Sequence, residues 1–166
     1  MPHLIKTSLE DISNLKTNLY SEDWETSLKA SDTLARLNNP EAISVLIDAL
    51  NSKNNWTRNS AALGIRETNN NYAFRALLER IKELGPHEEI GTLVYSLETV
   101  DCSEYLLDII ELHFNGNFEV ENATTTILNE QEFKLSNEEF EKLKSKLQEY
   151  GMTVEDFDIK YKINEA

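Results

Sequence analysis

An apolar pattern that returns every 31 to 32 residues constrains the fold of this 166-residue chain more than any other feature. Three sets of residues share one helical spacing at offsets of 31: Ile12/Leu15/Leu19, Ile43/Leu46/Leu50 and Phe74/Leu77/Ile81. At offsets of 32, Trp24 returns as Trp56 and Ile65 as Leu97. Both tryptophans are expected in the core. Helix pairs that recur at a constant step predict an α-solenoid, because each pair must stack on the next to bury its apolar face.

Capping residues mark where these helices begin and end. Asn39 is a good N-cap before Pro40, and Ser136 with Glu139 forms a capping box. Gly85 and Gly151 suit the position after a helix. Helices are expected to begin after Ser8, near Asn55 and after Asp101. Further helices are expected over residues 24–37, 40–50, 72–84, 87–99, 118–129 and 137–150.

These helices predict an all-α fold, a right-handed α-solenoid of about four antiparallel pairs. The solenoid would occupy residues 1–151 as one domain, with residues 137–150 as a capping helix. Residues 152–166 would form a tail, either extended or disordered, because Phe157, Ile159, Tyr161 and Ile163 alternate with the period of a strand. A non-repeating helical bundle is the alternative, although it would give no constant offset.

Residues 40–65 carry a more specific pattern. Pro40, Leu46-Ile47 and Leu50 are followed by Thr57-Arg58, Ala61-Ala62 and Leu63-Gly64. This arrangement resembles a HEAT repeat of the short bacterial kind, with Thr57 where that motif usually has Val. The resemblance implies an α-solenoid that serves as a protein-binding scaffold. It implies no active site, because the repeat motif contains none.

The charge of the chain is concentrated in one stretch. The net charge is −14, yet residues 1–82 hold ten acids and ten bases. Residues 83–133 hold twelve acids and no Lys or Arg. Such a chain is not expected to bind nucleic acid or an anionic membrane, because both would repel it. No stretch reaches the length of a membrane span or a signal peptide, so a cytoplasmic location is expected.

Residues suited to catalysis or metal binding do not form a recognisable set. The only cysteine, Cys102, follows an expected helix N-cap that could lower the pKa of its thiol, but a semi-buried structural thiol is favoured. His3, His87 and His113 are widely separated, and Gly91 stands where a zinc helix starting His87-Glu88-Glu89 would need its second histidine. We therefore expect no enzyme, no metal site and no cofactor.

The candidate binding residues lie on the second helices of the later repeats, which usually line the concave face of such solenoids. They are Glu88, Glu89, Tyr95, Glu98, Glu119 and Glu121. Carboxylates interspersed with an aromatic ring attract and hold a basic protein surface. The alternative is an acidic face that contacts only solvent.

The sequence therefore favours a non-enzymatic module that binds a basic protein. A bacterial immunity protein that neutralises a toxin is one candidate, since the basic cleft of a nuclease toxin would suit an acidic solenoid. A general adaptor or scaffold subunit of an assembly is a second candidate. A lyase-like enzyme or enzyme subunit related to short HEAT proteins is a third, and it predicts a deep polar pocket.

Overall fold

The computed structural model of the chain describes residues 9–86 and 88–164. They form two compact units, Met1–Glu83 (unit 1) and Leu84–Ala166 (unit 2). The predicted all-α class is confirmed, with two short strands added in unit 2. The predicted domain of residues 1–151 and the right-handed twist stay predictions.

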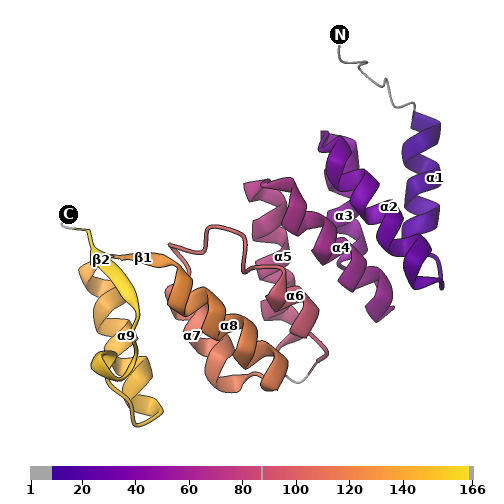
Figure 1. The fold of residues 1–166 in the computed structure, drawn as a ribbon. Helices are drawn as coiled ribbons and strands as arrows, with labels where there is room; N and C mark the ends of the chain where they lie inside the picture. Colours follow the sequence, from indigo (N-terminus) through magenta and orange to yellow (C-terminus); the bar gives the residue numbers. More distant parts are fainter. Residues whose placement is uncertain (1–8, 87, 165–166) are drawn as a thin grey trace. The chain divides into compact units, whose positions relative to one another are not determined.

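Unit 1 is a stack of helices joined by short turns (Figure 1). Its second helix packs against the first, third and fourth. The helices are α1 (Leu9–Leu19), α2 (Trp24–Leu37), α3 (Pro40–Ala49), α4 (Asn55–Thr68) and α5 (Asn71–Leu84), the last residue of α5 falling in unit 2. Every one of these helices was predicted from the sequence; the cap expected at Ser8 lies outside the described residues.

Two adjacent asparagines stand at each junction between repeats in unit 1, at 38–39 and 69–70. Asn38 and Asn69 both end a helix in the left-handed conformation, with φ of 45° and 49°. The residue after each of them caps the next helix through its side chain, since Asn39 accepts from Ala42 N–H and Asn70 from Ala73 N–H. The Asn38 amide also donates to the Thr68 carbonyl at 3.1 Å, which links the ends of α2 and α4. The offset of 31 residues thus has a structural basis.

Small side chains let α2 and α4 approach closely. Ser27 and Ser60 share a hydrogen bond of 2.9 Å, and the Ser31 hydroxyl donates to the Ser60 carbonyl. A Cβ atom on Gly64 would lie 2.2 Å from Ser31 Oγ and 3.1 Å from Leu46 Cδ2, so only glycine fits there. Burial of these polar groups is tolerated because they are hydrogen-bonded.

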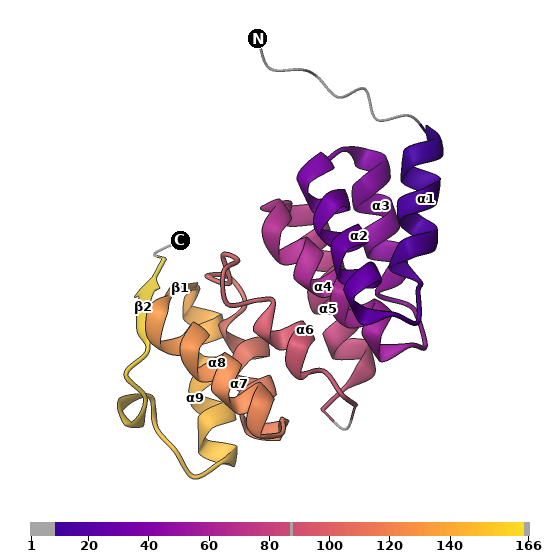
Figure 2. The same cartoon turned by 45° about the vertical axis from the view of Figure 1, so that its right-hand side comes forward.

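Unit 2 is less regular, as Figure 2 shows in a second view. Helix α8 packs against α6 and α7, and α9 packs against α7, β1 and the 3₁₀ turn η1. The elements are α6 (Gly91–Tyr95), α7 (Leu106–Asn115), α8 (Phe118–Glu130), β1 (Glu132–Leu135), α9 (Asn137–Glu149), η1 (Val154–Asp156) and β2 (Lys160–Ile163).

Two predicted helix boundaries in unit 2 are wrong. The helix expected at 87–99 is reduced to α6, with turns from Ser96 to Thr99, and its predicted start at His87 lies outside the described residues. Ile90 gives α6 no side-chain cap, and the Ser96 hydroxyl bonds back to the Thr92 carbonyl. Asp101 does not cap α7: its carboxylate accepts from Ser103 N–H in a local turn, and α7 begins only at Leu106.

Within the described part of the tail, residues 160–163 form strand β2, which has a partner strand that the sequence did not predict. Strand β2 pairs with β1 in parallel, with Glu132 opposite Lys160 and Leu135 opposite Ile163. The Lys162 ammonium lies 2.6 Å from the Glu132 carboxylate. Since Phe133 and Leu135 are buried, β1 has the alternating burial of a one-sided strand.

Candidate protein-interaction site

An open hollow lies between α6 and α8 in unit 2. It is lined by Gly91, Thr92, Tyr95, Glu98, Glu119, Asn122 and Ala123, which we call the α6–α8 hollow. Tyr95, Glu98 and Glu119 are three of the six residues predicted from the sequence. The fold thus brings together two carboxylates and an aromatic ring from α6, the turn after it and α8.

Small residues allow the two helices to meet at this hollow. Gly91 and Ala123 are both buried at its base. A Cβ atom on Gly91 would lie 2.2 Å from a carboxylate oxygen of Glu119 and 2.9 Å from its Cβ, so the Glu119 side chain lies directly over Gly91. Glycine at this position therefore leaves room for the Glu119 side chain.

Two aromatic side chains that lie close in sequence to these carboxylates are exposed to solvent. Tyr95 is 44% exposed, and Phe118, the residue before Glu119, is 75% exposed. No Lys or Arg lines the hollow. Exposed aromatic rings beside carboxylates are more typical of a contact surface than of a purely solvated face.

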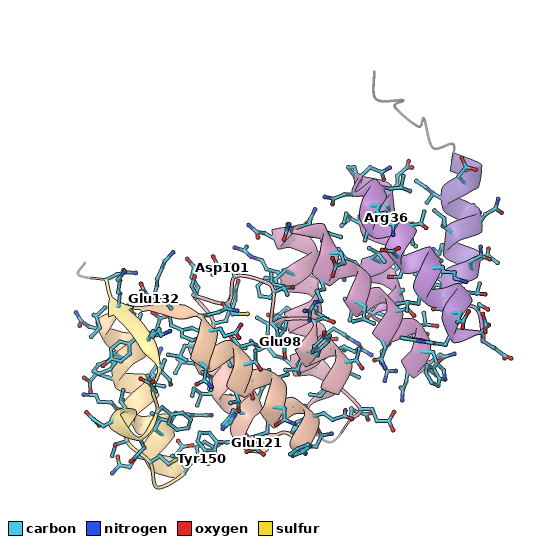
Figure 3. The ribbon with its side chains drawn as sticks, viewed as in Figure 1. Arg36, Glu98, Asp101, Glu121, Glu132 and Tyr150 are labelled. Atoms are coloured by element: carbon cyan, nitrogen blue, oxygen red, sulfur yellow. The ribbon has the colours of Figure 1, made fainter. Side chains whose placement is uncertain are left out.

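The other predicted residues lie elsewhere. Glu88 and Glu89 are exposed in the bend before α6 and do not line the hollow. Glu121 is also absent from its lining, and its charge acts instead on His113 of α7. In Figure 3, Glu98 and Glu121 accordingly lie well apart. The predicted set is therefore split between the hollow, the bend before α6 and the α7 side of α8.

Sequence reasoning missed the neutral residues of the hollow. Asn122 and Ala123 stand three and four residues after Glu119, so they share its face of α8. Thr92 lies three residues before Tyr95 on α6. This helical spacing could have placed Asn122 and Ala123 beside Glu119 before the structure was known.

On its α7 side, α8 contacts an aromatic cluster that holds unit 2 together. His113 Nδ1 lies 3.0 Å from the Thr124 hydroxyl, and burial lowers the pKa of His113 below its usual value, although Glu121 opposes that shift. The rings of Phe114 and Tyr150 stack with centroids 4.0 Å apart, which ties α7 to the end of α9, where Figure 3 labels Tyr150. Phe157 packs edge-on against both His113 and Phe114.

Cys102 is a structural residue. It is fully buried, and desolvation raises the pKa of its thiol to about 12, so the thiolate needed for nucleophilic chemistry does not form near neutral pH. Gln131 holds this segment in place: its side chain accepts from Cys102 N–H and donates to the Glu98 and Val100 carbonyls. The same glutamine thereby anchors the backbone that carries Glu98.

The described residues contain no group of three or more His, Cys, Asp or Glu placed to hold a metal ion. His87, from which a zinc helix would have started, lies outside them. Among the helices of the described ranges, none has the length and apolar character needed to cross a membrane.

The tryptophan pair in unit 1 is partly at the surface. Trp24 and Trp56 contact each other with ring centroids 5.2 Å apart, at the matching starts of α2 and α4. Trp24 is half-buried, but Trp56 is 54% exposed, so the expectation that Trp56 is a core residue is wrong. The contact between the two rings shows how residues at matching repeat positions meet in a stacked array.

Comparison with known proteins agrees with this architecture. The family model of HEAT repeats matches residues 12–90. No curated protein matches the chain significantly. HEAT repeats are generally non-enzymatic and commonly mediate contacts between proteins. Residues 12–90 of this chain are therefore similar to HEAT repeats.

Proposed function

We propose that this chain is a non-enzymatic protein-binding module whose α6–α8 hollow receives a basic surface of its partner. The observation that carries the proposal is the composition of residues 83–133, which hold twelve acids and no Lys or Arg, and which contribute every residue of the hollow. HEAT repeats in the same chain support a role in protein contacts.

This charge acts both at long range and at short range, with different effects. Over the whole of residues 83–133, unbalanced carboxylates attract a basic partner from a distance and speed its association. Within the hollow, Glu98 and Glu119 supply short-range acceptors and Tyr95 supplies apolar contact area. Contacts of the second kind decide how long the complex lasts.

The finer proposal is a bacterial immunity protein that acts in the cytoplasm by blocking a toxin. A toxin that acts on nucleic acid needs a basic cleft, and an acidic surface with exposed aromatic rings is complementary to such a cleft.

Protein products of the neighbouring genes provide the direct test. We expect one of them to arrest growth when expressed alone and to be harmless when expressed with this chain. The purified pair should bind at least about tenfold more weakly at about 0.5 M salt than at about 0.05 M salt, because salt screens charge. Binding that is independent of salt would contradict the charge argument.

A set of substitutions locates the contact. Replacing the five predicted acids Glu88, Glu89, Glu98, Glu119 and Glu121 by Gln should weaken binding by at least about tenfold. The matched control replaces five exposed acids of α9 and the tail, Glu138, Glu141, Glu149, Glu155 and Asp158, by the corresponding amides. Equal loss in the two sets would place the contact elsewhere.

A further inference from the structure

We propose that the open edge of strand β2 binds an extended segment of a partner protein in which acidic and apolar residues alternate. The segment would pair antiparallel with β2 and become the third strand of the sheet. This contact goes beyond the proposed function, because it uses other elements of unit 2 and selects the opposite charge in its ligand.

The backbone of β2 leaves one row of hydrogen-bonding groups unused. Asn164 N–H donates to the Leu135 carbonyl at 2.8 Å, so Asn164 and, two residues earlier, Lys162 direct their N–H groups toward β1. Backbone groups alternate in direction along a strand, so the N–H and C=O groups of Tyr161 and Ile163 point away from β1. No backbone group in the described part of the chain pairs with them.

The opposite edge of the sheet is already covered. Figure 1 shows β2 lying alongside β1. On the other side of β1, Lys134 N–H donates to the Ser103 carbonyl at 2.8 Å, in the turn before α7. Within the described residues, β2 therefore carries the open edge of the sheet. A strand edge of this kind is a template on which a further strand can pair.

One face of β2 offers apolar surface to a third strand. Tyr161 lies opposite the buried Phe133 of β1, and its ring stacks on Phe140 of α9 with centroids 5.3 Å apart. Ile163 lies opposite Leu135, but Ile163 is 38% exposed whereas Leu135 is 2% exposed. Apolar residues of a third strand would cover Ile163 and lie beside Tyr161, as cross-strand neighbours do.

The other face of the sheet selects acidic residues. Lys160 and Lys162 are exposed there, in line with Glu132 and Lys134 of β1. The Lys162 ammonium lies 2.6 Å from the Glu132 carboxylate, so β1 already supplies one acid to this row. Acids on a third strand, opposite the two lysines of β2, would add a second row of attractive pairs. A second copy of this chain fits less well, because its β2 would place lysine beside lysine.

Two labelled octapeptides test the proposal on the full chain by fluorescence anisotropy at about 0.1 M salt. Both alternate valine with glutamate, and in the second peptide the backbone nitrogen of every valine is methylated. The valines would lie opposite Tyr161 and Ile163 and would exchange hydrogen bonds with them, so methylation removes the donors of that pairing. We expect the methylated peptide to bind at least about tenfold more weakly.

A proline variant locates the contact on the outer edge of β2. Ile163→Pro removes an N–H that points away from β1, while the N–H groups of Lys162 and Asn164 that face β1 are kept. Proline is tolerated in edge strands at such positions. Binding of the unmethylated peptide should fall at least about fivefold. The control Ile163→Ala keeps the N–H and should weaken binding by only about twofold.

Charge variants test the preference for acids. Lys160→Gln with Lys162→Gln should weaken the unmethylated peptide by about threefold. The charge-matched control, Lys29→Gln with Lys142→Gln, changes exposed lysines of α2 and α9 and should alter binding by less than about twofold. Thermal unfolding shows that each variant is folded, and slow hydrogen exchange at Lys162 N–H shows that β2 still pairs with β1.

The outcomes are distinct from those for the acidic surface. Absence of binding by the unmethylated peptide at concentrations up to about 1 mM overturns the β2 edge as a binding site. Equal binding of the two peptides, or equal loss in the Ile163→Pro and Ile163→Ala variants, also overturns it, because backbone pairing then does not hold the peptide. A dimer that forms without peptide and is lost in Ile163→Pro would assign the edge to a second copy instead. None of these results changes the case for a basic partner at the α6–α8 hollow.

Discussion

Unit 1 and unit 2 are both helical, but they differ in regularity and in charge. Unit 1 repeats its left-handed asparagines and the caps that follow them at an offset of 31 residues, and residues 1–82 are electrically balanced. Unit 2 has a five-residue α6, a parallel strand pair and an aromatic cluster, and it contains nearly all of the base-free stretch. The family match at residues 12–90 covers most of unit 1 and only the first residues of unit 2.

The comparison teaches that regular packing and specific recognition place different demands on a sequence. Close approach of α2 and α4 requires Ser31, Ser60 and Gly64, which leaves little freedom at those positions. A binding surface instead favours exposed charge and exposed rings, which cost stability through repulsion and exposure. In this chain the close helix packing lies in unit 1, and the proposed binding surface lies in unit 2.

Phe133→Ala is expected to have the largest effect and to test whether the units unfold separately. Phe133 is fully buried in β1, and truncation of such a side chain costs about 3–5 kcal/mol. Hydrogen exchange measured by mass spectrometry should show protection lost in unit 2 and kept in unit 1. The control Phe133→Leu should lower the stability much less. Equal loss of hydrogen-exchange protection in both units would show that they unfold as one cooperative structure.

Gly64→Ala should lower the free energy of unfolding by about 1–3 kcal/mol, because the alanine Cβ collides with Ser31. Protection from hydrogen exchange should then be lost in unit 1 and kept in unit 2. Chemical denaturation combined with hydrogen exchange measures the change and its location. Adding Ser31→Ala removes the hydroxyl in the 2.2 Å contact and should restore part of the loss. If the double variant is simply the sum of the two single changes, the close contact is not the cause.

Mild acid should destabilise unit 2 in particular, with the smallest effect of the three. Burial lowers the pKa of His113 in the folded state, so the unfolded chain binds the proton first as the pH falls below about 6.5. Stability is therefore full above that pH and falls below it. Between pH 7.5 and 5.5 the unfolding temperature should drop by a few degrees, and His113→Gln should reduce that drop. An unchanged pH dependence in the variant would assign it to other groups.

Most of the fold could be predicted because its signals are local. Asn39, Ser136, Gly85 and Gly151 all act where the sequence placed them, and Ser136 with Glu139 forms the expected capping box. Helix α8 forms despite its run of threonines. The hydroxyls of Thr124, Thr125 and Thr126 donate to backbone carbonyls of the preceding turn. These features depend on neighbours within four residues.

The failures depend on distant contacts or on ambiguous local chemistry. Strand β1 exists because β2 pairs with it from 28 residues further along the chain, a separation that no local pattern reveals. Asp101 before Ser103 fits a helix cap and an isolated turn equally well, and the structure has the turn. Half of the candidate residues lie together as expected. Glu98 and Glu119 were chosen for their charge and Tyr95 as an aromatic residue among the acids, and all three line the hollow. The separation of Glu121 from them follows from the way α8 faces both α6 and α7.

The asparagine junctions of unit 1 have a consequence for engineering. Residues 39–69 begin just after one left-handed asparagine and end on another, so the segment has matching geometry at its two ends. A tandem duplicate of these 31 residues would join itself through the same Asn-Asn step that already connects α2 to α3 and α4 to α5. The repeat is thus a cassette, and the number of copies of it is a variable that a protein designer can set.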